Sequence, residues 1–137
     1  MVNRWLLKTE PRDYSFSDLV RDGQTVWDGV RAPLALKNIA LMREGDPVFI
    51  YHTGKGPSIV GTAEVTRGPY QDPGEKDPRF LVVEVKAAGP LQRPVPLREL
   101  KEKGFPPEWE LLRLPRLSVV PVSLKDWEKI IDLSKQK

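Results

Sequence analysis

The sequence predicts an α+β fold: a small mixed β-barrel of five to six strands with several short helices packed around it. Short runs of β-branched and aromatic residues recur along the chain, and segments with helix start and stop signals separate them. There is no internal repeat, coiled-coil heptad or low-complexity tract. Many short strands joined in this way are typical of a small barrel. The 137 residues suit a single domain, 1–137, that is long enough to bury a core.

The chain begins with a predicted strand and a short helix. Residues 4–9 form an apolar run that ends ahead of Pro11, and a proline favours extended geometry in the residue before it. Ser15, with Asp18 three positions later, has the pattern of a helix start, and Gly23 predicts the helix end.

A second helix and a hairpin follow. Residues 25–27 predict a brief strand, and Pro33 is well placed to open a helix that ends at Gly45. Residues 48–52 and 59–66 predict paired strands. The apolar face expected for the helix consists of Leu34, Ile39, Leu41 and Met42. Gly61 has no side chain to pack, so we expect a bend there or a close approach by another group.

The second half of the chain is richer in proline. Residues 67–78 predict a loop without secondary structure, and residues 80–85 predict a central strand, since an apolar run favours burial on both faces. Residues 90–96 predict an irregular link. The remaining expected elements are short helices over 97–101 and 107–112, a strand over 116–122 in which Pro121 indicates an edge or a strand end, and a helix capped by Ser123 with Leu124, Trp127, Ile130 and Ile131 on one face.

The composition excludes several classes of function. Without cysteine there are no disulfides, thiolate chemistry or cysteine zinc sites, and the single histidine, His52, allows no histidine cluster for a metal. We therefore expect no cofactor and no metal. The net charge of +3 permits contact with a polyanion. No signal peptide and no membrane-spanning run is visible, so we expect a cytoplasmic protein with no membrane partner.

An enzymatic function finds little support. His52 is the only side chain that titrates near neutral pH by default, and no Gly-x-Ser-x-Gly elbow accompanies it. Gly54-Lys55-Gly56 lacks the spacing of a phosphate-binding loop. Glu10 and Asp28 form a conceivable acid pair, but carboxylates near strand ends are more often solvated or capping groups. A nucleotide or nucleic-acid hydrolase is thus the less favoured alternative.

A binding site is better supported, because aromatic and cationic residues gather near predicted strand ends. Residues 27–31 combine an aromatic ring, a carboxylate, a glycine and an arginine, and Asp28 and Gly29 end any strand there. Trp27, Tyr51 and Thr9 would lie at strand ends. The cations Lys8, Arg31, Lys37 and Arg116 could line the rim. Such a set suits a nucleobase with its phosphate. The alternative is that Trp27 fills the core and the charges are a solvated face.

Seven spaced motifs, in order from Trp5 to the C-terminal helix, resemble the EVE domain family. They are Trp5-Leu6-Leu7-Lys8-Thr9-Glu10-Pro11, Tyr14-Ser15-Phe16, Trp27-Asp28-Gly29-Val30-Arg31, Gly45-Asp46, Tyr51-His52, Val60-Gly61-Thr62-Ala63-Glu64-Val65 and Arg116-Leu117-Ser118-Val119. The resemblance implies a PUA-like fold similar to YTH domains, with a pocket for a modified nucleobase.

The resemblance also implies roles for individual residues. Trp27 would be the main wall of an aromatic cage, Thr9 the small hydroxyl residue after the first strand, and Tyr51 and His52 part of the strand that closes the site. Arg31 and Ser118 match positions near the same mouth, where Lys8, Lys37 and Arg116 are candidates for phosphate contacts. Polar groups around Thr9 and the Asp28 backbone would read the edge of the base.

This chain departs from the family pattern at two places. Ala32-Pro33 stands where the family commonly has Asn, and Leu114-Pro115 stands where it has Gln-Ser. The sequence leaves open whether the ligand is DNA, RNA or a free nucleotide, which modification is preferred, and which oligomer forms. A protein-interaction scaffold of the same fold is the main alternative.

Overall fold

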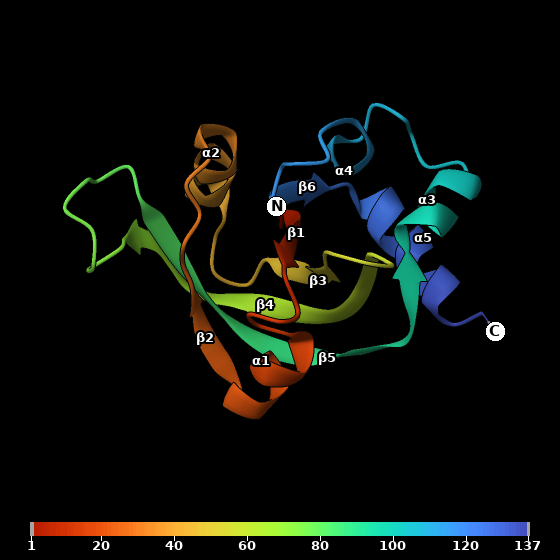
Figure 1. Cartoon of the computed structure of the whole chain (residues 1–137), viewed down its shortest axis with the longest axis horizontal. Helices are drawn as coiled ribbons and strands as arrows, with labels where there is room; N and C mark the ends of the chain where they lie inside the picture. The colour runs from red at the N-terminus through yellow and green to blue at the C-terminus, as the bar shows by residue number, and fades with distance from the viewer. Residues whose placement is uncertain (1, 137) are drawn as a thin grey trace.

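The computed structural model describes residues 2–136, and six strands form one sheet in it. They are β1 (Arg4–Thr9), β2 (Gln24–Trp27), β3 (Pro47–His52), β4 (Ser58–Gln71), β5 (Leu81–Pro96) and β6 (Val119–Val122). Their order across the sheet is β2-β5-β4-β3-β1-β6. The pair β1 and β3 is parallel, and the other neighbours are antiparallel. Figure 1 labels these strands and the helices around them.

The parallel pair forces a long crossover, because two parallel strands cannot be joined by a tight turn. The crossover, residues 10–46, carries α1 (Phe16–Asp22), β2 and α2 (Pro33–Leu41). Within it β2 departs to the far edge of the sheet, where it pairs with β5. Residues adjacent to β1 and β2 can therefore face each other without strand pairing between them.

The sheet is open, so the prediction of a closed barrel is wrong. Within residues 2–136 its edges are β2 and β6, which pair only with β5 and β1 respectively. β2 has four residues, and Gly29, two residues beyond it, has a φ of 77°, a left-handed conformation that suits glycine. The strand thus ends before it can pair with a second neighbour. The α+β class and the six strands are confirmed.

The predicted caps of the first and last helices are confirmed. The Ser15 hydroxyl accepts a hydrogen bond from the Asp18 backbone at 3.0 Å, and the Asp18 carboxylate accepts one from the Ser15 backbone at 2.9 Å. Gly23, with a φ of 78°, ends α1. At α5 (Leu124–Ser134), the Ser123 hydroxyl accepts from the Asp126 backbone at 3.1 Å.

The inward face of α2 differs in part from the predicted one, of which Ile39 and Met42 are buried as expected. Leu34 and Leu41 are 43% and 50% exposed, and the helix ends at Leu41 instead of Gly45. Its buried residues are Ala35, Leu36, Asn38 and Ile39. The Asn38 side-chain amide donates to the Val119 carbonyl oxygen at 2.8 Å, which orients this face toward β6. A polar residue thus belongs to the face that periodicity assigned to leucines.

Two stretches predicted to be irregular are strands. The predicted loop over 67–78 begins only after Gln71, because β4 continues to that residue, and the predicted link over 90–96 is the second half of β5. The pairing of β4 with β5 shifts register between Ile59 and Gly61 and again between Thr62 and Ala63. Proline lacks an N–H for the ladder and is tolerated at such irregularities, which accounts for Pro90 opposite Gly61.

The Phe16 ring approaches the backbone at Gly61, so the close approach predicted from the missing side chain of this glycine is confirmed. A Cβ atom added there would lie 2.4 Å from the tip of the Phe16 ring. Phe16 is the first residue of α1, and its ring is buried. The contact therefore fixes the start of α1 on the sheet.

The C-terminal part follows the predicted order of elements. The remaining helices are α3 (Leu97–Glu102) and α4 (Glu110–Arg113), and β6 starts at Val119, three residues later than predicted, at an edge as Pro121 indicates. Trp127 is half-buried and stacks on Phe49 at 3.7 Å between ring centroids, whereas Leu124 is exposed. Within residues 2–136 no helix combines the length and hydrophobicity needed to cross a bilayer.

Candidate functional site

A cavity of about 620 Å³ lies between the end of β1 and the end of β2. Its walls come from the last residues of each strand, the turns that follow them and one residue ahead of β6. The lining residues are Lys8, Thr9, Glu10, Asp13, Tyr14, Thr25, Val26, Trp27, Asp28, Gly29, Val30, Arg31 and Ser118. We call this space the Trp27 cavity.

Backbone hydrogen bonds shape the β1 side of the cavity. The Glu10 carbonyl oxygen accepts from the backbone N–H groups of Asp13 and Tyr14, each at 2.9 Å, so the chain turns directly after Pro11. The Thr9 hydroxyl donates to the Tyr14 carbonyl oxygen at 2.6 Å. The turn thereby brings the Tyr14 ring back over the strand end, and the lone pairs of the Thr9 hydroxyl remain able to accept a hydrogen bond.

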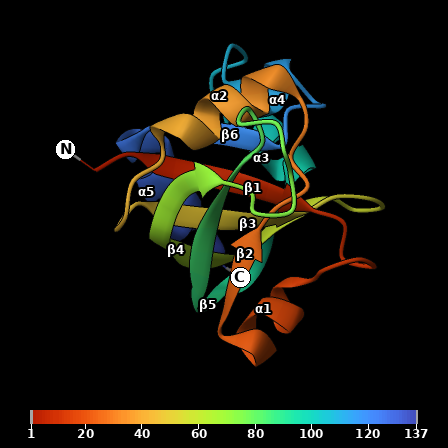
Figure 2. The ribbon, with the colours of Figure 1, turned by 90° about the vertical axis from the view of Figure 1, so that its left-hand side faces the viewer.

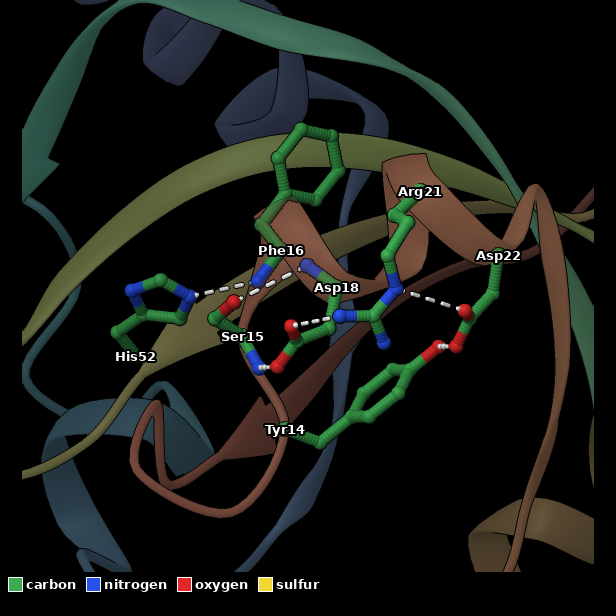
Figure 3. A network of polar contacts seen from close by, with 7 residues as sticks. All are labelled: Tyr14, Ser15, Phe16, Asp18, Arg21, Asp22 and His52. Carbon is green, nitrogen blue, oxygen red and sulfur yellow. Dashed lines mark hydrogen bonds and ion pairs between the residues drawn. The ribbon is translucent and has the colours of Figure 1, made fainter.

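Trp27 and Tyr14 form the aromatic part of the wall. Their ring centroids are 6.3 Å apart with an interplanar angle of 82°, an edge-to-face contact. The Tyr14 hydroxyl donates to the Asp22 carboxylate at 2.8 Å, a contact visible in Figure 3. Trp27 is 8% exposed, so most of the indole already contacts protein atoms. Only the remaining part of the ring is available to a ligand.

Both signs of charge line the cavity. The Lys8 ammonium donates to the Pro115 carbonyl oxygen at 2.9 Å, and its burial lowers the pKa of this amine. Glu10, Asp13 and Asp28 add three carboxylates. A ligand here can therefore find acceptors for amino groups and a cation for an anionic group. No group of three or more potential ligand side chains within residues 2–136 is placed to hold a metal ion.

Arg31 stands at the boundary of the cavity. Its guanidinium pairs with the Glu75 carboxylate and lies 4.2 Å from the centre of the Phe80 ring. Both partners belong to residues 72–80, the segment between β4 and β5, which faces the viewer beside the chain leading to α2 in Figure 2. More than half of the Arg31 side chain remains exposed.

The structure brings six of the ten predicted site residues together. The six that line the Trp27 cavity are Lys8, Thr9, Trp27, Asp28, Arg31 and Ser118. The four that do not are Tyr51, His52, Lys37 and Arg116. Lys37 lines a separate groove with Arg31, and Arg116 is exposed beyond the cavity wall.

His52 and Tyr51 have structural positions. The imidazole Nε2 of His52 accepts a hydrogen bond from the Phe16 backbone at 3.0 Å, so His52 satisfies a free N–H at the start of α1 (Figure 3). Burial lowers the pKa of His52, and the Glu10 charge opposes that shift. Tyr51 is 3% exposed, and its ring lies 5.5 Å from the Lys8 ammonium. The neutral imidazole is already engaged as an acceptor.

Sequence reasoning missed part of the wall. Tyr14, Asp13 and Thr25 line the cavity, and Glu10 entered the sequence analysis only as half of an acid pair. The polar turn between the first strand and the Ser15 cap could have indicated these residues. The side chains of a turn that follows a strand directly lie close to the end of that strand. The Tyr14 contact with Trp27 joins residues 13 positions apart, which no local pattern indicates.

Fold and site together define a small α+β domain with a cavity lined by aromatic rings and by charges of both signs. A family model described as the EVE domain matches residues 3–133, and the chain belongs to that family. The resemblance seen in its motifs is thereby confirmed.

The relatives share the whole domain. Mouse thymocyte nuclear protein 1 is 30% identical over 167 residues, which cover 97% of this chain and 74% of the mouse protein. A hypothetical protein from Leishmania major superposes with a TM-score of 0.91 at 33% identity, over 98% of this chain and 96% of the other. The human THYN1 protein, solved in complex with 5-methylcytosine-containing DNA, superposes with a TM-score of 0.90 at 26% identity, over 98% and 99%.

Proposed function

We propose that this chain is a nucleic-acid-binding module that holds one modified nucleobase in the Trp27 cavity. The observation that carries the proposal is the cavity itself, in which an indole, a phenol ring and hydrogen-bonding groups converge. Its volume of about 620 Å³ lies in the range of ~300–1,000 Å³ typical of ligand sites. The DNA complex of the human relative supports nucleic acid as the partner.

Recognition requires an unpaired or extruded base. Its ring contacts the open part of Trp27, while the Thr9 hydroxyl and the backbone around Asp28 read its edge. The Thr9 hydroxyl already donates to Tyr14, so toward the base it acts as an acceptor, which suits an exocyclic amino group. Lys8 and Arg31 provide positive charge at the cavity wall.

The energies favour modest affinity. Stacking on one aromatic residue contributes about 1–3 kcal/mol, and a ring that is 8% exposed supports the lower end of that range. A buried methyl group adds about 0.8 kcal/mol. Burial of the methyl group alone should then give about 4-fold discrimination for a methylated base, and a closely fitted pocket should give about 10-fold and stay below ~200-fold.

The position of His52 supports a binding function without catalysis. It lies outside the Trp27 cavity and uses Nε2 to accept from the Phe16 backbone, so it is not placed as a general base for a ligand beside Trp27. This arrangement supports recognition over hydrolysis.

The test is calorimetric titration of cytidine, 5-methylcytidine and short strands containing either base. Trp27→Leu should weaken binding of the methylated ligand about 5-fold or somewhat more, the equivalent of the lower end of one stacking contact. Trp27→Phe should retain part of the affinity, and Trp127→Phe, which alters a tryptophan outside the cavity, should retain all of it.

Two outcomes would contradict the proposal. Binding that is equal in the Trp27→Leu and Trp127→Phe variants would exclude the cavity and favour the scaffold alternative. Turnover of a nucleotide that disappears in a His52 variant would favour the hydrolase.

A further inference from the structure

A second groove, of about 350 Å³, lies on the other side of Arg31 from the Trp27 cavity. It has an apolar floor of Pro33, Leu36 and Phe80, and a rim of three cationic residues, Arg31, Lys37 and Arg79. Among residues 2–136 no carboxylate lines it. An apolar floor beneath several cations matches the chemistry of a nucleotide, which has a flat base and a phosphate.

The groove is continuous with the Trp27 cavity. A smaller hollow of about 240 Å³ adjoins both; it shares residues 28–31 with the Trp27 cavity, and Arg31 and Phe80 with the groove. The carboxylates of Asp28, Asp72 and Glu75 also line this hollow, so Arg31 is the cationic residue in its lining that can meet a linking phosphate. The three hollows therefore adjoin one another, and Arg31 lines all of them. A chain with one base beside Trp27 would have to pass Arg31 to reach the groove.

The rim can exchange its present partners for phosphate. Arg31 pairs with Glu75 and Arg79 pairs with Asp77, and both arginine side chains remain more than half exposed. Exposed ion pairs contribute little net free energy, so an incoming phosphate displaces them readily. Lys37 is exposed on α2 beside them. Arg79 and Phe80 also stand next to each other in sequence, so the phosphate and ring contacts come from one short segment.

We infer that this groove binds the nucleotide adjoining the one held beside Trp27, with the linking phosphate at Arg31. The base of the second nucleotide rests on Phe80, Leu36 and Pro33, and its phosphate lies between Lys37 and Arg79. The inference rests on the proposed function and adds a second subsite to it. Pro33, one of the departures from the family pattern, thereby belongs to the floor of the groove.

The test compares one nucleoside with single strands of increasing length that contain the same modified base. We expect the dinucleotide and longer strands to bind more tightly than 5-methylcytidine. Lys37→Gln and Arg79→Gln should weaken strand binding without affecting the nucleoside, and each should reduce the slope of log affinity against log salt by about 0.7. Phe80→Leu should weaken strand binding about 5-fold or more, since it removes a stacking ring but keeps apolar volume.

The matched control is Lys125→Gln, which makes the same charge change on the exposed start of α5. Thermal unfolding of Phe80→Leu confirms that the variant is folded. Equal losses in Lys37→Gln and Lys125→Gln, or strands that bind no tighter than the nucleoside, would overturn the second subsite while the Trp27 cavity stands. Strand binding that depends on Lys37 and Phe80 but not on Trp27 would support the groove and overturn the proposed base cavity.

Discussion

Gly61 shows how one missing side chain positions an element. The Phe16 ring occupies the space that a Cβ atom would need, at 2.4 Å. Gly61→Ala should lower the free energy of unfolding by about 1–3 kcal/mol, because a buried ring must be displaced in a packed core. Urea denaturation measures the loss.

Gly89→Ala is the control for this prediction. Gly89 lies on β5 opposite Thr62, and an added Cβ atom would meet nothing within 4 Å. Equal effects of the two substitutions would show that backbone entropy, and not contact with Phe16, decides the result.

His52 predicts a pH dependence of stability. Burial lowers its pKa in the folded state below the ordinary value of 6.5. The unfolded chain therefore takes up the proton first, and stability should fall as the pH decreases from about 6.5 through the folded pKa. Protonation also removes the Nε2 acceptor used by the Phe16 backbone.

The measurement is the free energy of unfolding between pH 7.5 and 5.5, above the range in which most carboxylates titrate. His52→Asn should flatten the profile, since this is the single histidine of the chain. A profile as steep in the variant as in the parent would assign the effect to another group.

At the scale of one residue, sequence reasoning succeeded where geometry is local. The structure contains the capping box predicted at Ser15 and the close approach predicted at the Gly61 backbone. The positions of His52 and Tyr51 could not be predicted in the same way. Alternation along a strand says which residues share a face, but His52 contacts Phe16, 36 positions away.

Among the elements, α1 carries one side of the candidate site, and its cap should be important for stability. Ser15→Ala removes the acceptor for the Asp18 backbone and should cost about 1 kcal/mol. Ser17→Ala is the matched control, because Ser17 is exposed within the same helix. Chemical denaturation of both variants tests this, and a loss that is no larger at Ser15 would contradict the capping role.

The boundaries of helices were predictable where a single residue, such as a glycine or a capping serine, sets the start or the end of the helix. Gly23 ends α1, and Ser123 precedes α5. The extents of β4 and β5 were not predictable, because their prolines are tolerated through register shifts that only the paired strand reveals. The face of α2 was predicted only in part, with Ile39 and Met42 buried as expected. Asn38 was missed for a related reason: it is buried by a hydrogen bond to β6, a partner 81 residues away.

The whole molecule should prefer bases that are already unpaired. Extruding a base from a duplex costs a few kcal/mol, which exceeds what the small open part of Trp27 can return. A single strand containing the modified base should bind about 10-fold or more tightly than the matched duplex. Competition titrations with both forms test this, and a duplex that binds as well as the strand would contradict it.

At this scale the number of strands was predictable, and the closure of the sheet was not. The open edge at β2 depends on a four-residue strand that ends at Trp27. The same geometry explains which candidate residues meet, since Thr9, Trp27 and Asp28 lie at or directly after strand ends on either side of the opening. Lys37 lies beyond Arg31 because a helix, and not a strand end, positions it.

The crossover between β1 and β3 has a consequence for how such a domain can diversify. Ten of the thirteen residues that line the Trp27 cavity lie within residues 10–46, outside the central parallel pair. The glycines and turns of this crossover can change in sequence while the hydrogen-bonded strands β1, β3 and β4 stay the same. One contiguous exchange of about 37 residues could therefore graft a relative's ligand preference onto this scaffold.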